Sequence, residues 1–142
     1  MSLQNYSNHR RFVPLFHFFT MLGTLFLLIG AIVNLVKSSH ENIYNASLLV
    51  FGSLLLLLTA FYARVFALKA QDRAIKVEEN FRHYILTGKV LDSKLTVQQI
   101  VGLRFASDEE FPDLAKKAIA ENLSQNAIKK SIEHWKEDTY RV

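Results

Sequence analysis

The chain contains no cysteine and only five glycines in 142 residues, and each shortage excludes a class of site. Without cysteine there is no disulfide framework and no cysteine-ligated metal centre. None of the glycines forms a phosphate-binding loop, and the GxSxG and HExxH patterns are also missing. We therefore expect a non-enzymatic protein with no catalytic residues, no cofactor and no bound metal.

Charge is also missing from two long apolar runs, residues 15–36 and 46–63. Each is close to the roughly 20 apolar residues that a helix needs to cross a bilayer. Only residues 37–45 separate them, so the sequence predicts a helical hairpin across a membrane. The first run is longer than the roughly 7–15 apolar residues of a secretory signal, and no small-residue cleavage site follows it. We therefore expect it to be retained as a span.

Most of the formal net charge of +4 lies outside residues 69–142. Residues 69–142 hold 13 Lys and Arg against 12 Asp and Glu, whereas Arg10 and Arg11 precede the first run and Arg64 ends the second. Positive residues flank the cytoplasmic ends of membrane spans. Both termini are therefore predicted in the cytoplasm, with Arg10, Arg11 and Arg64 in contact with lipid headgroups.

The second apolar run continues into a polar segment without a helix breaker. Residues 53–87 contain neither glycine nor proline, which predicts one helix from about residue 46 to residue 85. From Ala46 to Tyr84 this helix carries a 3-4 spacing of mostly small residues, here called the seam, which is typical of packing against another helix. The predicted packing residues are Gly23, Gly30, Ser53, Ala60, Ala63, Ala67, Ala70, Ala74, Val77 and Phe81. Two interpretations stay open: packing within one protomer, or packing between identical protomers.

Three short helices are expected in the C-terminal part. Thr96 with Gln99, and Ser107 with Glu110, fit the capping box that opens a helix, and Ser124 fits a third N-cap. No alternating strand pattern occurs in the sequence.

The last of these helices is predicted to present Ile128, Ile132 and Trp135 on one face, because they recur at i, i+4 and i+7. This helix and residues 103–110 are the expected docking surfaces for a partner. The candidate docking residues are Leu103, Arg104, Phe105 and Trp135.

Residues 118–132 also match a helix-turn-helix pattern, with Asn122 at the left-handed turn position and Lys129 and Lys130 on the second helix. A DNA-binding module carries a strongly basic face, whereas this tail is nearly neutral. The acidic residues between 108 and 113 fit the first turn of a helix better than a metal site. DNA binding is therefore a remote alternative, and we expect no nucleic-acid partner.

Several stretches together resemble an uncharacterised family of small bacterial membrane proteins, a family of unknown function. They are residues 4–11 with 14–17, residues 70–74, residues 103–110 (LRFASDEE), and residues 128–130 with Trp135 and 138–142. The resemblance spans nearly the whole chain. It implies two membrane spans, a helical cytosolic tail, a bacterial origin and no established activity. We therefore expect the protein in the bacterial inner membrane.

The sequence thus predicts an all-α protein with two parts. Residues 1–68 form an N-terminal segment and a transmembrane hairpin with spans at about 15–36 and 46–68, and residues 69–142 form a cytosolic helical extension and a small helical tail. The expected function is that of a scaffold or accessory subunit in a membrane complex, in contact with membrane lipids. The expected partners are further copies of this chain or a larger membrane-protein complex. The alternatives are an oligomeric channel or small transporter component, and a membrane enzyme using His9 or His17.

Overall fold

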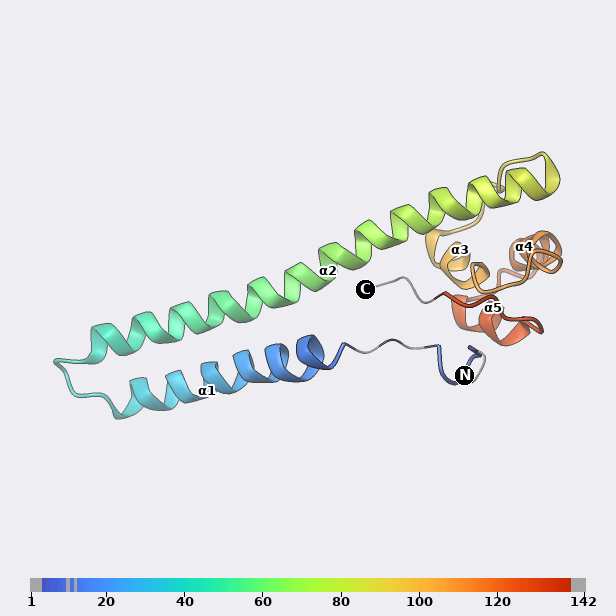
Figure 1. Cartoon of the computed structure of the whole chain (residues 1–142). Coiled ribbons are helices and arrows are strands. Elements are labelled where there is room, and N and C mark those ends of the chain that lie inside the picture. Colours follow the sequence, from blue (N-terminus) through green and yellow to red (C-terminus); the bar gives the residue numbers. More distant parts are fainter. Residues whose placement is uncertain (1–3, 10, 12, 139–142) are drawn as a thin grey trace. The chain divides into compact units, whose positions relative to one another are not determined.

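The computed structural model describes residues 4–9, 11 and 13–138, and this part of the chain is helical with no strand. Its helical segments, in chain order, are η1 (Leu15–Thr20), α1 (Met21–Lys37), α2 (Ile43–Thr87), α3 (Val97–Leu103), α4 (Phe111–Ala120) and α5 (Gln125–Ser131) (Figure 1). The prediction of an all-α protein is confirmed.

The chain divides into two compact units, and α2 contributes to both. Phe12–Ala67 form the hairpin unit. Met1–Arg11 and Leu68–Val142 form the tail unit. The sequence grouped the N-terminal segment with the hairpin, whereas in the structure this segment packs with the C-terminal helices.

In the hairpin unit, residues 38–42 connect α1 to α2, and the turn is closed by the Asn42 N–H, which donates to the Ser39 carbonyl at 3.0 Å. The buried residues of this unit are small ones: Ala31 on α1, and Ala46 and Ser53 on α2. Small side chains let two helix backbones approach closely. Ala46 and Ser53, two positions of the seam on α2, are therefore buried by packing within this unit.

Gly23 and Gly30 do not lie at a close approach in this unit. A Cβ added to either glycine would meet no atom within 4 Å. The tight contact that the sequence suggested at these glycines is made at Ala31 instead, which is 2% exposed.

The first predicted span, at residues 15–36, begins with a π-helical segment, η1, before continuing as α1. The Thr20 hydroxyl donates to the carbonyl of Leu15, five residues earlier, at 3.1 Å. His17 lies in η1 with its Nδ1 3.0 Å from the Val13 carbonyl. The wider first turn is a difference from the simple α-helix that the sequence predicts.

Two helical stretches are long and apolar enough to span a membrane: Leu15–Lys37, which joins η1 and α1, and Ile43–Thr87, which is α2. Most large apolar side chains in the hairpin unit are exposed, including Phe19, Phe26 and Phe66. This apolar surface needs a non-aqueous environment or a partner.

The predicted long helix is confirmed as α2, which extends two to three residues beyond each expected end. It ends before Gly88, whose φ of 71° is a left-handed conformation that glycine adopts without a Cβ clash. Within the tail unit, Ile75 and Glu79 on α2 are buried. The face of α2 that carries the seam is exposed there.

The core of the tail unit is built mainly by α3, α4 and α5, which lie together in Figure 1. Its buried apolar residues are Ile75, Leu95, Ile100, Val101, Leu103, Phe105, Ala106, Phe111, Leu114, Ala115, Ala118, Ile128 and Ile132. Gly102 allows α3 to approach α5 closely. A Cβ at Gly102 would lie 3.1 Å from the Gln125 carbonyl oxygen and 3.3 Å from Cγ2 of Ile128.

Three of the predicted local signals are confirmed in the tail unit. Thr96 and Gln99 form a full capping box at α3, and the Ser124 hydroxyl caps α5. Asn122, in the turn between α4 and α5, has a φ of 47°. Asparagine tolerates this left-handed conformation better than most residues.

The second predicted capping box is only half formed. The Ser107 hydroxyl accepts a hydrogen bond from the Glu110 N–H at 3.3 Å. The Glu110 carboxylate does not accept a hydrogen bond from the backbone N–H of Ser107, as a full capping box requires. It accepts one from the N–H of His134 instead, at 2.8 Å. A long-range contact therefore takes the place of the local one.

The prediction that Trp135 lies on the last helix is wrong. Helix α5 ends at Ser131, and Trp135 pairs with Ala106 in an isolated antiparallel bridge. The Lys136 N–H donates to the Phe105 carbonyl at 2.7 Å, and the segment after α5 is therefore extended beside residues 105–107.

Candidate functional site

Arg82 on α2 is the centre of a charged network in the tail unit. Its Nη1 donates to Glu79 Oε2 at 2.9 Å, and its Nε donates to Asp108 Oδ1 at 2.7 Å. Its Nη2 donates to the Ala106 carbonyl at 2.7 Å, and the guanidinium lies 4.6 Å from the centroid of the Phe111 ring. Charge-assisted hydrogen bonds to carboxylates are the strong ones in proteins. The fork therefore holds α2 against the turn that precedes α4.

Glu79 is an acid of this network with a perturbed pKa. Burial raises its pKa above the ordinary value, and the hydrogen bond and charge of Arg82 oppose that rise. Only the Arg82–Glu79 pair is largely buried, because the side chain of Asp108 is 55% exposed. The perturbed pKa is thus explained by packing and a structural ion pair.

A groove of about 850 Å³ lies beside this network, entirely within the tail unit. It is lined by Arg11, Gln71, Ala74, Ile75, Glu78, Glu79, Phe81, Arg82, Ile85, Leu86, Arg104, Asp108, Lys136, Glu137 and Asp138. This lining includes acidic, basic and apolar side chains. Such a mixed and open surface suits contact with another polypeptide more than enclosure of a small substrate.

Several charges of the groove are arranged in pairs. Arg104 Nε lies 3.2 Å from Oδ2 of Asp138. Lys136 Nζ lies 3.9 Å from Oδ1 of Asp108. The guanidinium of Arg104 is also stacked 4.6 Å from the centroid of the Phe105 ring. These basic groups therefore stabilise the tail unit itself.

The N-terminal segment is held on the tail unit through His9. Its ring lies 5.7 Å from the rings of both Phe105 and Trp135. Its Nδ1 is 2.6 Å from the Tyr6 carbonyl, which requires the proton on Nδ1, and its Nε2 is 3.3 Å from Lys129 Nζ. His9 is therefore a packed, hydrogen-bonded side chain that links the two ends of the chain.

The side-chain amide of Gln4 reinforces this link through the backbone of Asp138. The Asp138 N–H donates to the side-chain oxygen of Gln4 at 2.8 Å. The sequence pattern contains no signal for a contact between residues 134 positions apart.

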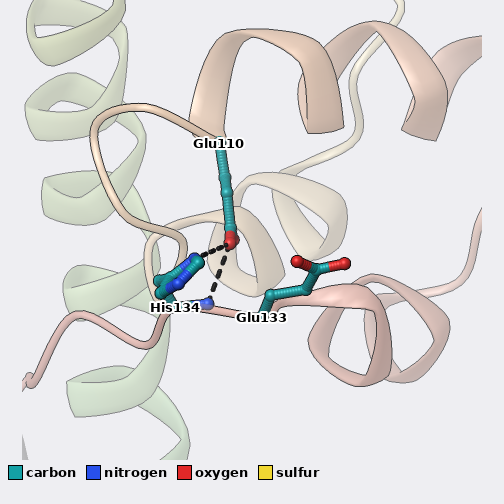
Figure 2. Close-up of side chains that lie close together, drawn as sticks. All are labelled: Glu110, Glu133 and His134. Atoms are coloured by element: carbon teal, nitrogen blue, oxygen red, sulfur yellow. Dashed lines mark hydrogen bonds and ion pairs between the residues drawn. The ribbon is translucent and has the colours of Figure 1, made fainter.

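Glu110, Glu133 and His134 bring three potential metal-ligating atoms within 4.8 Å of one another (Figure 2). The Glu110 oxygen and His134 Nδ1 are already bonded to each other at 2.8 Å. The Glu133 and His134 side chains are exposed, and Glu110 also accepts the His134 N–H. The hydrogen bonds from His134 to Glu110 attach the segment after α5 to the turn before α4, and this role explains the cluster without a metal.

The structure places the predicted docking residues inside the tail unit. Leu103 and Phe105 have no exposed area, so a partner could not reach them, and this part of the prediction is corrected. Arg104 is buried beside Asp138, and Trp135 is half-buried, with its ring centroid 5.1 Å from that of Phe105. The apolar character of residues 103–105 reflects the core and not a surface.

Other predicted positions are distributed over both units. Lys129, which the helix-turn-helix interpretation placed on a recognition helix, is 9% exposed and lies over the Phe105 ring. Arg11 lines the groove of the tail unit, and Arg64 belongs to the hairpin unit. Arg10 lies outside the described residues.

The network of Arg82, Glu79 and Asp108 was not found from the sequence. The sequence does contain a signal for the Glu79–Arg82 pair. Ile75, Glu79 and Arg82 share one face of α2, at i, i+4 and i+7. The partner carboxylate of Asp108 lies 26 residues further on, and no local pattern links it to that face.

These features define an all-helical protein with two long apolar helical stretches, which indicate membrane association, and a separately packed helical tail unit. The chain belongs to a family of unknown function, DUF6526, which matches it over residues 1–142. This membership confirms the resemblance to an uncharacterised family. No curated protein and no solved structure matches the chain.

Proposed function

We propose that this protein is a non-enzymatic scaffold or accessory subunit of a bacterial inner-membrane complex. The hairpin unit spans the bilayer, both termini lie in the cytoplasm, and the tail unit presents a docking surface there. The protein assembles with copies of itself or with a larger membrane complex.

The exposed apolar surface of the hairpin unit carries this proposal. Phe19 is 74% exposed, Phe26 is 67% exposed and Phe66 is 62% exposed. Burying apolar area gains about 25 cal/mol per Å², so leaving such a surface in water is costly. A bilayer covers it without any partner protein, and the length of each apolar stretch fits that role.

The distribution of charge supports the orientation. Arg11 precedes the first apolar stretch and Arg64 lies near the end of the second, whereas Lys37 and Glu41 around the connection cancel each other. An excess of Arg and Lys marks the cytoplasmic side. The same arginines would contact anionic headgroups.

The absence of cysteine from the chain provides a direct test of orientation. Ser39→Cys in the connection and Ser131→Cys at the end of α5 each place one thiol at an exposed position. In spheroplasts, a membrane-impermeant maleimide should label Ser39→Cys, whereas Ser131→Cys should be labelled only after lysis. The unsubstituted chain is the control for background labelling. Recovery in the soluble fraction, or the reverse labelling pattern, would refute the proposed topology.

The scaffold role is tested by the mass of the native protein extracted in nanodiscs, together with whatever copurifies. A defined oligomer or a larger assembly supports the proposal. A lone monomer, or reproducible ion flux from the purified protein in liposomes, would contradict it and favour a different function.

A further inference from the structure

The face of α2 that points away from the core of the tail unit is open and apolar. Val77 is 70% exposed, Phe81 is 64% exposed and Tyr84 is 53% exposed. On the other side of the same helix, Ile75 and Glu79 are buried. A helix outside the membrane that exposes such a stripe is incomplete without a partner.

The spacing of the stripe specifies what kind of partner it needs. In heptad notation, Ala74 and Phe81 occupy a positions, and Ala70, Val77 and Tyr84 occupy d positions. A sustained 3-4 spacing is the pattern of helices that pack along one another in a coiled coil. The partner is therefore a helix with a matching stripe.

The tail helices do not obstruct such packing. Ile75 and Arg82 occupy b positions and Glu79 an f position, which together form the back of the heptad. The core and the Arg82 network thus bind α2 from behind, and the a and d positions stay exposed. The groove borders the stripe on one side, because Ala74 and Phe81 also line it.

Charges beside the stripe favour one occupant and one orientation. Arg73 is at a g position and Glu78 is at the e position five residues later, and both are exposed. In a parallel pair of helices, each g residue faces the e residue of the next heptad on the other helix. Two copies of this helix in register would therefore pair Arg73 with Glu78 twice. An antiparallel pair sets g against g and e against e, which offers neither residue an opposite charge.

We infer that residues 70–84 of α2 form a parallel, in-register coiled coil with the same residues of a second copy of this chain. The inference deepens the proposed function and rests on it for the orientation, since two hairpins inserted alike in one membrane present α2 in the same direction. The contact is isologous: both copies use the same surface, and a two-fold axis relates them.

Disulfide crosslinking of the full chain in native membranes tests the inference. Val77→Cys places a thiol at a d position, next to its counterpart in a parallel dimer, within reach of a disulfide. Lys76→Cys is the matched control, because it is adjacent and exposed but lies at an outer c position. Mild oxidation should give a dimer band for Val77→Cys, with about tenfold less for Lys76→Cys. Equal crosslinking of both, or none of either, would overturn the inference.

A charge exchange tests the register. In the Val77→Cys background, Arg73→Glu or Glu78→Arg should each weaken dimerisation about tenfold, because both symmetric pairs become repulsive. Exchanging both residues should restore crosslinking, which is the signature of a direct pair. A double exchange no better than the single changes would refute the parallel register.

The two proposals fail separately in these experiments. Membrane insertion is read from the labelling of Ser39→Cys, whereas the self-interface is read from Val77→Cys against Lys76→Cys. A membrane protein without the Val77→Cys dimer loses only this inference. A soluble protein with that dimer loses the membrane scaffold but keeps the interface.

Discussion

Replacing Arg82 with methionine should destabilise the tail unit strongly. Methionine keeps most of the apolar stem of arginine, so the change removes mainly the guanidinium group. Glu79 then loses its donor at 2.9 Å while it stays largely buried, and the Ala106 carbonyl loses a donor at 2.7 Å. The variant therefore strands a buried charge without emptying much volume.

The size of the effect follows from the burial of each partner. Removing one member of a buried ion pair costs about 3–5 kcal/mol. The contact to Asp108 adds less than about 1 kcal/mol, because that carboxylate is 55% exposed. Protonation of Glu79, whose pKa is already raised, relieves part of the cost. We therefore expect Arg82→Met to lower the free energy of unfolding by about 3 kcal/mol.

The single tryptophan of the chain provides the assay. Trp135 packs against Phe105 in the tail unit, so its fluorescence during urea titration of the full chain in detergent reports unfolding there. Lys76→Met is the matched control on an exposed position of α2 and should change stability by less than about 0.5 kcal/mol. Adding Glu79→Met to Arg82→Met should recover part of the loss, because the stranded charge is gone. Equal midpoints for Arg82→Met and the wild type would refute the reasoning.

Three further predictions use the same fluorescence assay. Gly102→Ala should lower the free energy of unfolding by about 1–2 kcal/mol through overpacking, because a Cβ there would lie 3.1 Å from the Gln125 carbonyl oxygen; an unchanged midpoint would contradict the packing of α3 on α5. Because burial raises the pKa of Glu79, the folded state binds its proton more tightly, and the contribution of this group to stability falls as pH rises from 4.5 through the raised value. Glu79→Gln should flatten that part of the stability-pH curve, and an unchanged slope would show that the carboxyl is not responsible. His9→Ala should shift the Trp135 emission to longer wavelength by admitting water beside the indole, and an unchanged spectrum would mean that the N-terminal segment does not cover it.

Local chemistry and periodicity were sufficient for the helices. The absence of glycine and proline after Gly52 predicted the continuity of α2, and Gly88 ends it. Thr96 and Ser124 were identifiable as caps because a cap depends only on residues within one turn. The two uncharged runs likewise predict apolar helices, since composition over about 20 residues is itself the physical requirement.

The sequence could not tell which apolar residues form the core of the tail unit. Leu103 and Phe105 looked like a surface motif, yet the packing of α3 against α5 removes them from solvent. Trp135 continued the spacing of α5, but pairing with Ala106 is available only once both segments are adjacent. Burial depends on contacts between distant segments, and a local pattern contains no information about them.

By itself, the sequence determined the all-helical class, the two apolar helices, the length of α2 and the caps, because each depends on neighbouring residues or on composition. Only the tertiary structure decided which face of α2 is covered: Ile75 and Glu79 meet the tail core, while Val77 and Phe81 stay exposed. It also decided that the N-terminal segment joins the tail unit, through contacts such as that between Gln4 and Asp138. These outcomes depend on the balance of packing and charge between segments far apart in the chain, which exists only after folding.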